Sequence, residues 1–207
     1  MESESMYRYD IINHFISKLN LKTYLEIGVF DGECIEKVNC PTKDGVDPCF
    51  EKGLSIGVNY KMTSDDFFNN NRDKFYDIIF IDGLHHSEQV DIDIENSLKQ
   101  TNNNGIVILH DCNPPTLEHT LIPRVQPQWN GDVYKSILKF RKNNKIHEYF
   151  TVDCDYGIGV IMKNYKSKNK VKNADFEKGI QSWDYFDLNR NNLLNLITTE
   201  EFQTLYL

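Results

Sequence analysis

The chain has 207 residues, which is enough for one full domain with little left for a second. It carries 23 basic and 31 acidic residues, a net charge of −8, and this balance argues against a nucleic-acid partner, because such proteins usually present a basic face. Its five cysteines form no CxxC pair, so the spacing of a structural zinc site is absent and a reduced protein is the simpler expectation.

The N-terminal segment and the apolar runs predict neither export nor membrane insertion. The opening residues, MESESMYRYD, have no basic region and no apolar core, unlike a signal peptide. No apolar run approaches the length of a membrane span. We therefore expect a cytoplasmic protein that does not enter the membrane.

The first half of the chain alternates predicted helices and strands. Apolar residues at helical spacing predict a helix over residues 7–19, and the continuous apolar run at 76–81 predicts a strand buried on both faces. Ser64 is the expected N-cap of a helix over 65–70, with acidic residues in its first turn. The other predicted elements are strands at 23–27, 45–47 and 54–60 and a helix over 87–98.

The second half continues this alternation and then ends it. Residues 102–105 predict a turn before a buried strand at 105–109, and a helix is predicted over 133–142. Two strands, at 147–152 and 157–162, follow with only a tight turn between them. The pattern predicts a doubly wound, mostly parallel seven-stranded α/β sheet with an antiparallel hairpin at its edge, a Rossmann-like fold.

A change of composition after Lys163 predicts a separate C-terminal extension. A segment rich in Lys, Asn and Ser, residues 166–173, leads into an amphipathic tail. We divide the chain into a domain at 1–165 and an extension at 166–207. The tail is expected to pack on the domain or on a partner subunit of a homo-oligomer, through the apolar residues Trp183, Phe186, Leu193, Leu194 and Phe202.

The stretch EIGVFDG ends the first predicted strand, where open α/β sheets bind their ligands. Gly28 can adopt a positive φ and lets a ligand approach the backbone, and Gly32 opens a helix. The spacing is GxxxG and not GxGxxG, so a pyrophosphate cradle is less favoured. Taken alone, the stretch is equally consistent with an ordinary strand-to-helix turn.

Asp47 ends the second predicted strand, nineteen residues after Gly28. An acidic residue at this place can accept both ribose hydroxyls of an adenosine. The alternative is a turn aspartate before Pro48. The agreement of spacing and strand context favours the ligand-binding interpretation.

Asp82 and His85 follow the clearest buried strand, in the sequence IDGLHH. A side chain at this strand end is expected to point into the crevice, and an imidazole there can take a hydroxyl proton near neutral pH. The alternative for each histidine is a helix-capping or surface role. The pairing with Asp82 favours catalysis.

His110 and Asp111 end the next strand, so Asp111 and Asp82 belong to neighbouring strand ends and can face each other. Two carboxylates beside an imidazole or amide offer a hard-oxygen site for Mg²⁺. The alternative is that these acids cap loops and orient His85 without a metal. The residues alone leave both readings open.

Together these segments resemble one branch of the class I S-adenosylmethionine-dependent methyltransferases. The stretches IIFIDGLHH and GIVILHD are similar to the branch's FIDGxH and GGxIVxHD signature, and the similarity runs from about Tyr24 to Met162. Members are often associated with surface-sugar biosynthesis. The resemblance implies an S-adenosylmethionine-dependent O-methyltransferase of a small hydroxylated acceptor, with a sugar or nucleotide sugar expected.

The resemblance also implies a role for each motif. Among related metal-dependent O-methyltransferases, an aspartate and a base three residues later match Asp82 and His85, and Mg²⁺ or Mn²⁺ would be held by Asp82, His110 and Asp111. The relatives carry an acidic or Asp-Asn pair where this chain has His110 and Asp111, and this departure puts the metal in question. The expected cofactor contacts are Glu26, Gly28 and Gly32 at the methionine end, Asp47 at the ribose, and Ser64, Asp65 and Asp66 at the adenine. Asp82 is also expected to contact the cofactor.

Two other functions compete with this one. A nicotinamide-dependent oxidoreductase or epimerase on a similar sheet would need GxGxxG and a Tyr-x-x-x-Lys pair. The first is missing, and neither Tyr156 nor Tyr165 has a lysine four residues later. A non-catalytic binding protein that kept the cofactor fold is the third hypothesis, and the presence of both Asp82 and His85 argues against it.

Overall fold

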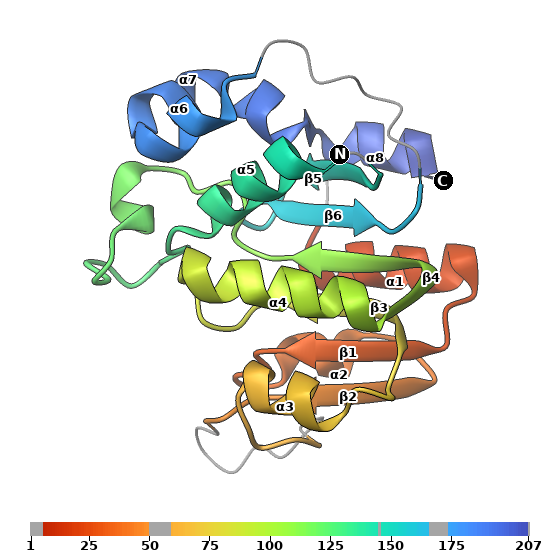
Figure 1. Cartoon of the computed structure of the whole chain (residues 1–207). Helices are drawn as coiled ribbons and strands as arrows, with labels where there is room; N and C mark the ends of the chain where they lie inside the picture. Colours follow the sequence, from red (N-terminus) through yellow and green to blue (C-terminus); the bar gives the residue numbers. More distant parts are fainter. Residues whose placement is uncertain (1–5, 50–58, 145, 166–173, 207) are drawn as a thin grey trace.

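The computed structural model describes residues 6–49, 59–144, 146–165 and 174–206. They form a seven-stranded sheet in the order β2-β1-β3-β4-β6-β5-β7, and β6 is the strand that runs antiparallel to its neighbours (Figure 1). The predicted mostly parallel sheet with an antiparallel hairpin is confirmed. The strands are β1 (Thr23–Ile27), β2 (Thr42–Val46), β3 (Tyr76–Ile81), β4 (Thr101–Leu109), β5 (Glu148–Val152), β6 (Ile158–Met162) and β7 (Leu196–Ile197).

Helices cover both faces of the sheet, as the doubly wound fold requires. One face carries α1 (Arg8–Leu19), α2 (Glu33–Lys37) and α8 (Thr199–Tyr206). The other carries α3 (Ser64–Asn70), α4 (Ser87–Gln100), α5 (Val133–Asn143), α6 (Phe176–Gln181) and α7 (Trp183–Leu194), and a short 3-10 helix, η1 (Leu117–Thr120), lies in the loop before α5 (Figure 1).

Strand β3 shows why the sequence folds into buried parallel strands. Its residues Ile78 and Phe80 pack into the cluster beneath α1, whereas Ile79 and Ile81 pack on the opposite face. All four side chains are at most 3% exposed, so an unbroken apolar run suits a strand that is covered on both sides. This burial holds the carboxyl end of β3, and Asp82 after it, in a fixed place.

Two local predictions were wrong. Residues 102–105 lie within β4 and not in a turn before it. Along the pairing of β3 with β4, Tyr76 pairs with Thr101 but Ile78 pairs with Ile106, so the extra residues of β4 form an irregularity in the strand. The side chain of Asn102 donates to Asp77 at 2.8 Å and anchors this irregularity. The N-cap of α3 is Thr63 and not Ser64, because the Thr63 hydroxyl accepts the Asp66 N–H at 3.1 Å.

The predicted strand at 54–60 lies mostly outside the described residues. Within the described part, Tyr60 forms a single parallel bridge with Val46. The linker predicted at 166–173 lies outside the described residues altogether.

The tail lies against both faces of the sheet. Phe186, Leu193 and Leu194 of α7 are fully buried in the cluster that includes α5, and Phe202 of α8 packs on Phe15 of α1 with ring centroids 5.7 Å apart. None of the helices in the described part is both long and apolar enough to span a membrane.

Candidate active site

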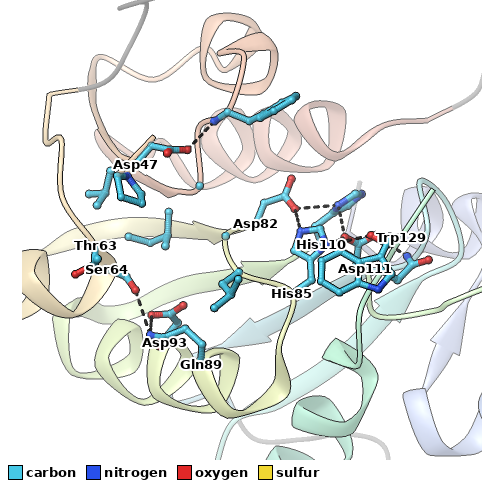
Figure 2. Close-up of a pocket in the computed structure, with 18 of the residues that line it drawn as sticks. Asp47, Thr63, Ser64, Asp82, His85, Gln89, Asp93, His110, Asp111 and Trp129 are labelled. Carbon is cyan, nitrogen blue, oxygen red and sulfur yellow. Dashed lines mark hydrogen bonds and ion pairs between the residues drawn. The ribbon is translucent and has the colours of Figure 1, made fainter. Parts of the chain in front are cut away.

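The carboxyl ends of β1, β2, β3 and β4 meet at one edge of the sheet, because these strands are parallel. A cavity of about 700 Å³ opens there. Figure 2 shows Asp47 on one side of this cavity, His85, Asp111 and Trp129 on the other, and Asp82 between the two sides. The structure therefore brings together the strand-end residues that the sequence singled out.

Gly28 allows the loop after β1 to pass close to the end of β3. Its φ is +85°, and a Cβ atom there would lie 2.2 Å from the carbonyl oxygen of Asp82. No other residue fits this position without moving the backbone. Gly32 caps α2 with a φ of +83° but does not line the cavity.

Asp47 is buried and holds the loop after β1 in shape. Its Oδ2 atom accepts the N–H groups of Val29 and Phe30, each at 2.9 Å, and Oδ1 accepts that of Cys49 at 2.8 Å. Oδ1 therefore keeps capacity for a further hydrogen bond, whereas both lone pairs of Oδ2 are in use. Asp47 can organise this loop and still receive a ligand hydroxyl.

The first turn of α3 supplies the next part of the wall. Ser64 and Asp65 line the cavity, whereas Asp66 is exposed, bonds to Thr63 and does not line it. Gln89 of α4 donates to Ser64 and Asp65 at 3.3 and 3.1 Å.

Gln89 also donates to Asp93 at 3.2 Å, and both residues line the cavity although the sequence analysis did not select them. Burial raises the pKa of Asp93 to about 6. In the sequence, Gln89 and Asp93 look like ordinary polar residues on one face of a helix, so nothing marked them as site residues.

Asp82 is the centre of a charged cluster. Its Oδ1 atom lies 3.1 Å from Nδ1 of His110 and 3.3 Å from Nε2 of His85, and its Oδ2 atom accepts from Nη1 of Arg8 at 2.9 Å. Burial alone would raise the pKa of Asp82, but these cationic partners hold it well below its usual value. The carboxylate is therefore ionised near neutral pH.

His85 lies between protein oxygens on both sides of its ring. Nδ1 is 3.1 Å from the Trp129 carbonyl oxygen and 3.1 Å from Oδ2 of Asp111, and the ring stacks on the Trp129 indole with centroids 5.5 Å apart. Burial lowers the pKa of His85, but Asp82 and Asp111 outweigh it and raise the pKa overall. This surrounding favours the imidazolium, so His85 must lose a proton before it can act as a base.

Asn130 is a site residue that the sequence analysis missed. It is 1% exposed, and its Nδ2 atom donates to Oδ1 of Asp111 at 2.5 Å. Its Oδ1 atom is buried and has no hydrogen-bond partner among the described residues. Gly131 presses this loop against His85, since a Cβ at its φ of +60° would lie 1.8 Å from the His85 carbonyl oxygen. An Asn-Gly pair is common in turns and by itself does not indicate a ligand site.

Arg8 and Asp155 were also missed. Arg8, the first residue of α1, donates to Asp155 through Nε at 2.8 Å and Nη2 at 3.1 Å. Asp155 lies in the turn between β5 and β6. Its Oδ1 atom is 3.4 Å from Nε2 of His110, which is close enough for an ion pair, but the two atoms do not form a hydrogen bond. Burial would raise the pKa of Asp155, but His110 and Arg8 lower it strongly.

The cluster contains a group of residues that could hold a metal ion. Asp82, His85 and Asp111 each offer a ligand atom within 4.8 Å of the others. His110, which was expected as a ligand, is not in this group, although its Nδ1 atom lies 3.3 Å from Oδ2 of Asp111. Carboxylates suit Mg²⁺ and Mn²⁺, whereas imidazole also suits Fe²⁺ and Zn²⁺. The donor set therefore fits a divalent cation.

One segment of the chain matches a known family model. A family model described as a methyltransferase domain matches residues 49–112, which include Asp82, His85, His110 and Asp111. No curated protein matches the sequence.

Among solved structures, an O-methyltransferase from Bacillus cereus in complex with SAH (S-adenosylhomocysteine) has a TM-score of 0.50 at 10% identity, over 78% of this chain and 84% of that one. SAH-bound methyltransferase PaMTH1 from Podospora anserina has a TM-score of 0.52 at 16% identity, over 73% and 76%.

MycE methyltransferase from the mycinamycin biosynthetic pathway, in complex with Mg, SAH and mycinamycin VI, has a TM-score of 0.50 at 14% identity, over 78% of this chain and 50% of that one. At these identities the likeness shows the fold, and the chain has a Rossmann-like methyltransferase fold.

Proposed function

We propose that this protein transfers a methyl group from S-adenosylmethionine to a hydroxyl group of a small acceptor, with a sugar or nucleotide sugar expected. The observation that carries the proposal is the cavity itself: Asp47 lies on one side and His85 and Asp111 on the other, with Asp82 between (Figure 2). A cofactor and an acceptor bound on these two sides would meet beside Asp82. The five free cysteines are consistent with a reducing, cytoplasmic setting.

On the cofactor side, each part of the adenosine has a suitable partner. Asp47 would receive a ribose hydroxyl, which suits a buried carboxylate with spare acceptor capacity. Ser64 and Asp65, held by Gln89, would contact the adenine. The walls beside them are apolar, with Ile27, Val46 and Leu84.

On the acceptor side, Asn130 favours a ligand that carries several hydroxyl groups. Its buried Oδ1 atom has no described hydrogen-bond partner, and leaving such an atom unpaired costs about 1–3 kcal/mol. A second hydroxyl of the acceptor would satisfy it while the first one reacts. This supports a polyhydroxylated acceptor over one with a lone hydroxyl.

For methyl transfer, the protein must align the acceptor hydroxyl with the methyl group and remove the hydroxyl proton. Methyl transfer is an in-line displacement: the acceptor oxygen bonds to the methyl carbon as the carbon–sulfur bond breaks, and the sulfonium becomes a thioether. His85, once deprotonated, would take the hydroxyl proton, and Asp82 and Asp111 would orient its ring. A divalent cation held by Asp82, His110 and Asp111 would lower the pKa of the acceptor hydroxyl.

A ligand and activity screen tests the proposal. SAH, NAD and NADP are titrated separately by calorimetry, and methyl transfer is then measured by mass spectrometry across free sugars and nucleotide sugars, with and without Mg²⁺ or Mn²⁺. We expect SAH to bind, the nicotinamide cofactors not to bind, and at least one sugar to gain a methyl group. Binding of NAD or NADP without SAH would instead support the oxidoreductase alternative.

A further inference from the structure

A second cavity, of about 350 Å³, adjoins the first. Arg8, Gly28, Phe30 and Asp82 line both cavities, so the two meet at the centre of the site. The second cavity extends away from Asp47 and His85, toward Glu26 and the first turn of α1. A cofactor with its adenosine in the first cavity would place its amino-acid end in the second.

We propose that Arg8 binds the carboxylate group of S-adenosylmethionine in this second cavity. The inference rests on the proposed function, since it concerns the same cofactor, and it assigns a residue that no sequence motif selected.

The charges around the second cavity explain why a carboxylate needs Arg8. Five acidic side chains line it among the described residues, against two basic ones, Arg8 and Lys37. Lys37 lies at the rim: its side chain is 44% exposed, and its Nζ atom pairs with Glu33 at 2.7 Å. Arg8 is the less exposed of the two cations, at 28%, and it contacts Asp82 at the junction of the cavities. The five acidic residues are Glu26, Asp31, Glu33, Asp82 and Asp155.

The guanidinium of Arg8 is fixed in orientation and has donors left. Its Nε and Nη2 atoms donate to Asp155 and its Nη1 atom to Asp82, and these bonds use three of its five N–H groups. One N–H on Nη1 and one on Nη2 remain for a ligand. Because the carboxylate partners already hold the group, binding would require little further ordering of the side chain.

The opposite charge of the amino acid has a partner as well. Glu26, at the end of β1, is 1% exposed and lines the second cavity, and its side chain accepts a hydrogen bond from Tyr24. The ammonium group of the cofactor could pair with Glu26 while its carboxylate pairs with Arg8. The carboxylate of the cofactor would then lie against a cation, and its ammonium group against the carboxyl group of Glu26.

Three ligands that differ only at the amino-acid end test this assignment. They are SAH, its decarboxylated analogue (which keeps the amine), and 5′-methylthioadenosine, which lacks both groups. Each is titrated by calorimetry into the full chain, into Arg8→Met and Arg8→Lys, and into Lys37→Met as the matched control for a cation of the same cavity. Circular dichroism and thermal unfolding report whether each variant is folded.

We expect the wild type to prefer SAH over the decarboxylated analogue by at least about tenfold, in line with a charge-assisted hydrogen bond. Arg8→Met should abolish this preference, Arg8→Lys should keep part of it, and Lys37→Met should keep all of it. An equal loss of affinity for all three ligands in Arg8→Met would show that Arg8 is only structural and would overturn the proposal.

The wild type alone can still overturn the proposal if Arg8→Met fails to fold. Equal affinity of the wild type for SAH and the decarboxylated analogue overturns the role of Arg8 but leaves the proposed function standing. Binding of none of the three ligands contradicts the proposed function itself, and the assignment of Arg8 with it.

Discussion

The Nε2 atom of His85 lies 3.3 Å from Oδ1 of Asp82, three residues earlier in the chain, while Nδ1 of the same ring faces Asp111. If His85 is the base, His85→Ala should lower kcat by roughly 10²–10⁴-fold and leave SAH affinity unchanged. Wild-type kcat should rise with pH through a value above 6.5, because the two carboxylates raise the pKa of His85. Steady-state kinetics across pH checks both expectations.

His110→Ala is the companion variant for this prediction. Near-normal turnover in His85→Ala together with an inactive His110→Ala would place the base at the end of β4 instead.

Asp47→Ala should weaken SAH binding by roughly 1–3 kcal/mol, because a ligand hydroxyl would be left unpaired in a buried site. Asp47→Asn keeps the size of the side chain but replaces one accepting oxygen by a donating NH2 group, so it should also weaken SAH binding. Asp66→Asn is the control, because Asp66 is exposed and outside the cavity. Unchanged calorimetric affinity in Asp47→Ala would remove Asp47 from the site.

Exhaustive chelation should abolish activity, and Mg²⁺ or Mn²⁺ should restore it, because carboxylate oxygens suit both ions. Asp111→Asn should reduce Mn²⁺ affinity, measured by electron paramagnetic resonance without any acceptor. If chelated enzyme keeps full activity, Asp82 and Asp111 serve only to orient the histidines.

Burial raises the pKa of Glu26 from 4.5 to about 8. Between these values the folded protein holds this proton more tightly than the unfolded chain does, so Glu26 should make the free energy of unfolding fall as pH rises, by at most about 1.4 kcal/mol per pH unit. Glu26→Gln, which can still accept from Tyr24, should lack this contribution. Denaturant unfolding of both proteins from pH 5 to pH 9 checks this, and parallel curves would contradict it.

Phe186→Ala should destabilise the fold by about 3–5 kcal/mol, because the Phe186 ring is fully buried and packs on the Tyr134 ring, with the two ring centroids 4.3 Å apart. Leu188→Ala is the control in the same helix, since Leu188 is 84% exposed and should change stability by less than about 0.5 kcal/mol. Equal urea midpoints for the two variants would mean that the tail does not contribute to the folding unit.

The sequence by itself determined the fold class and one set of site residues. Strand β3 begins and ends where its continuous apolar run predicts, because burial on both faces favours such a run, and β1 also has its predicted bounds. Asp47, Asp82 and Asp111 could be selected from the topology: each comes shortly after a parallel strand, and the carboxyl ends of such strands meet at one edge.

Only the tertiary structure decided which distant residues complete the site. Arg8 contacts Asp82 and Asp155 across 74 and 147 residues, and Asn130 reaches Asp111 across 19. No helical or strand repeat in the sequence relates such positions, because their contacts depend on how helices and loops pack around the edge of the sheet. The same packing leaves Asp66 outside the cavity and Asp65 inside it, because neighbouring residues of a helix point in different directions.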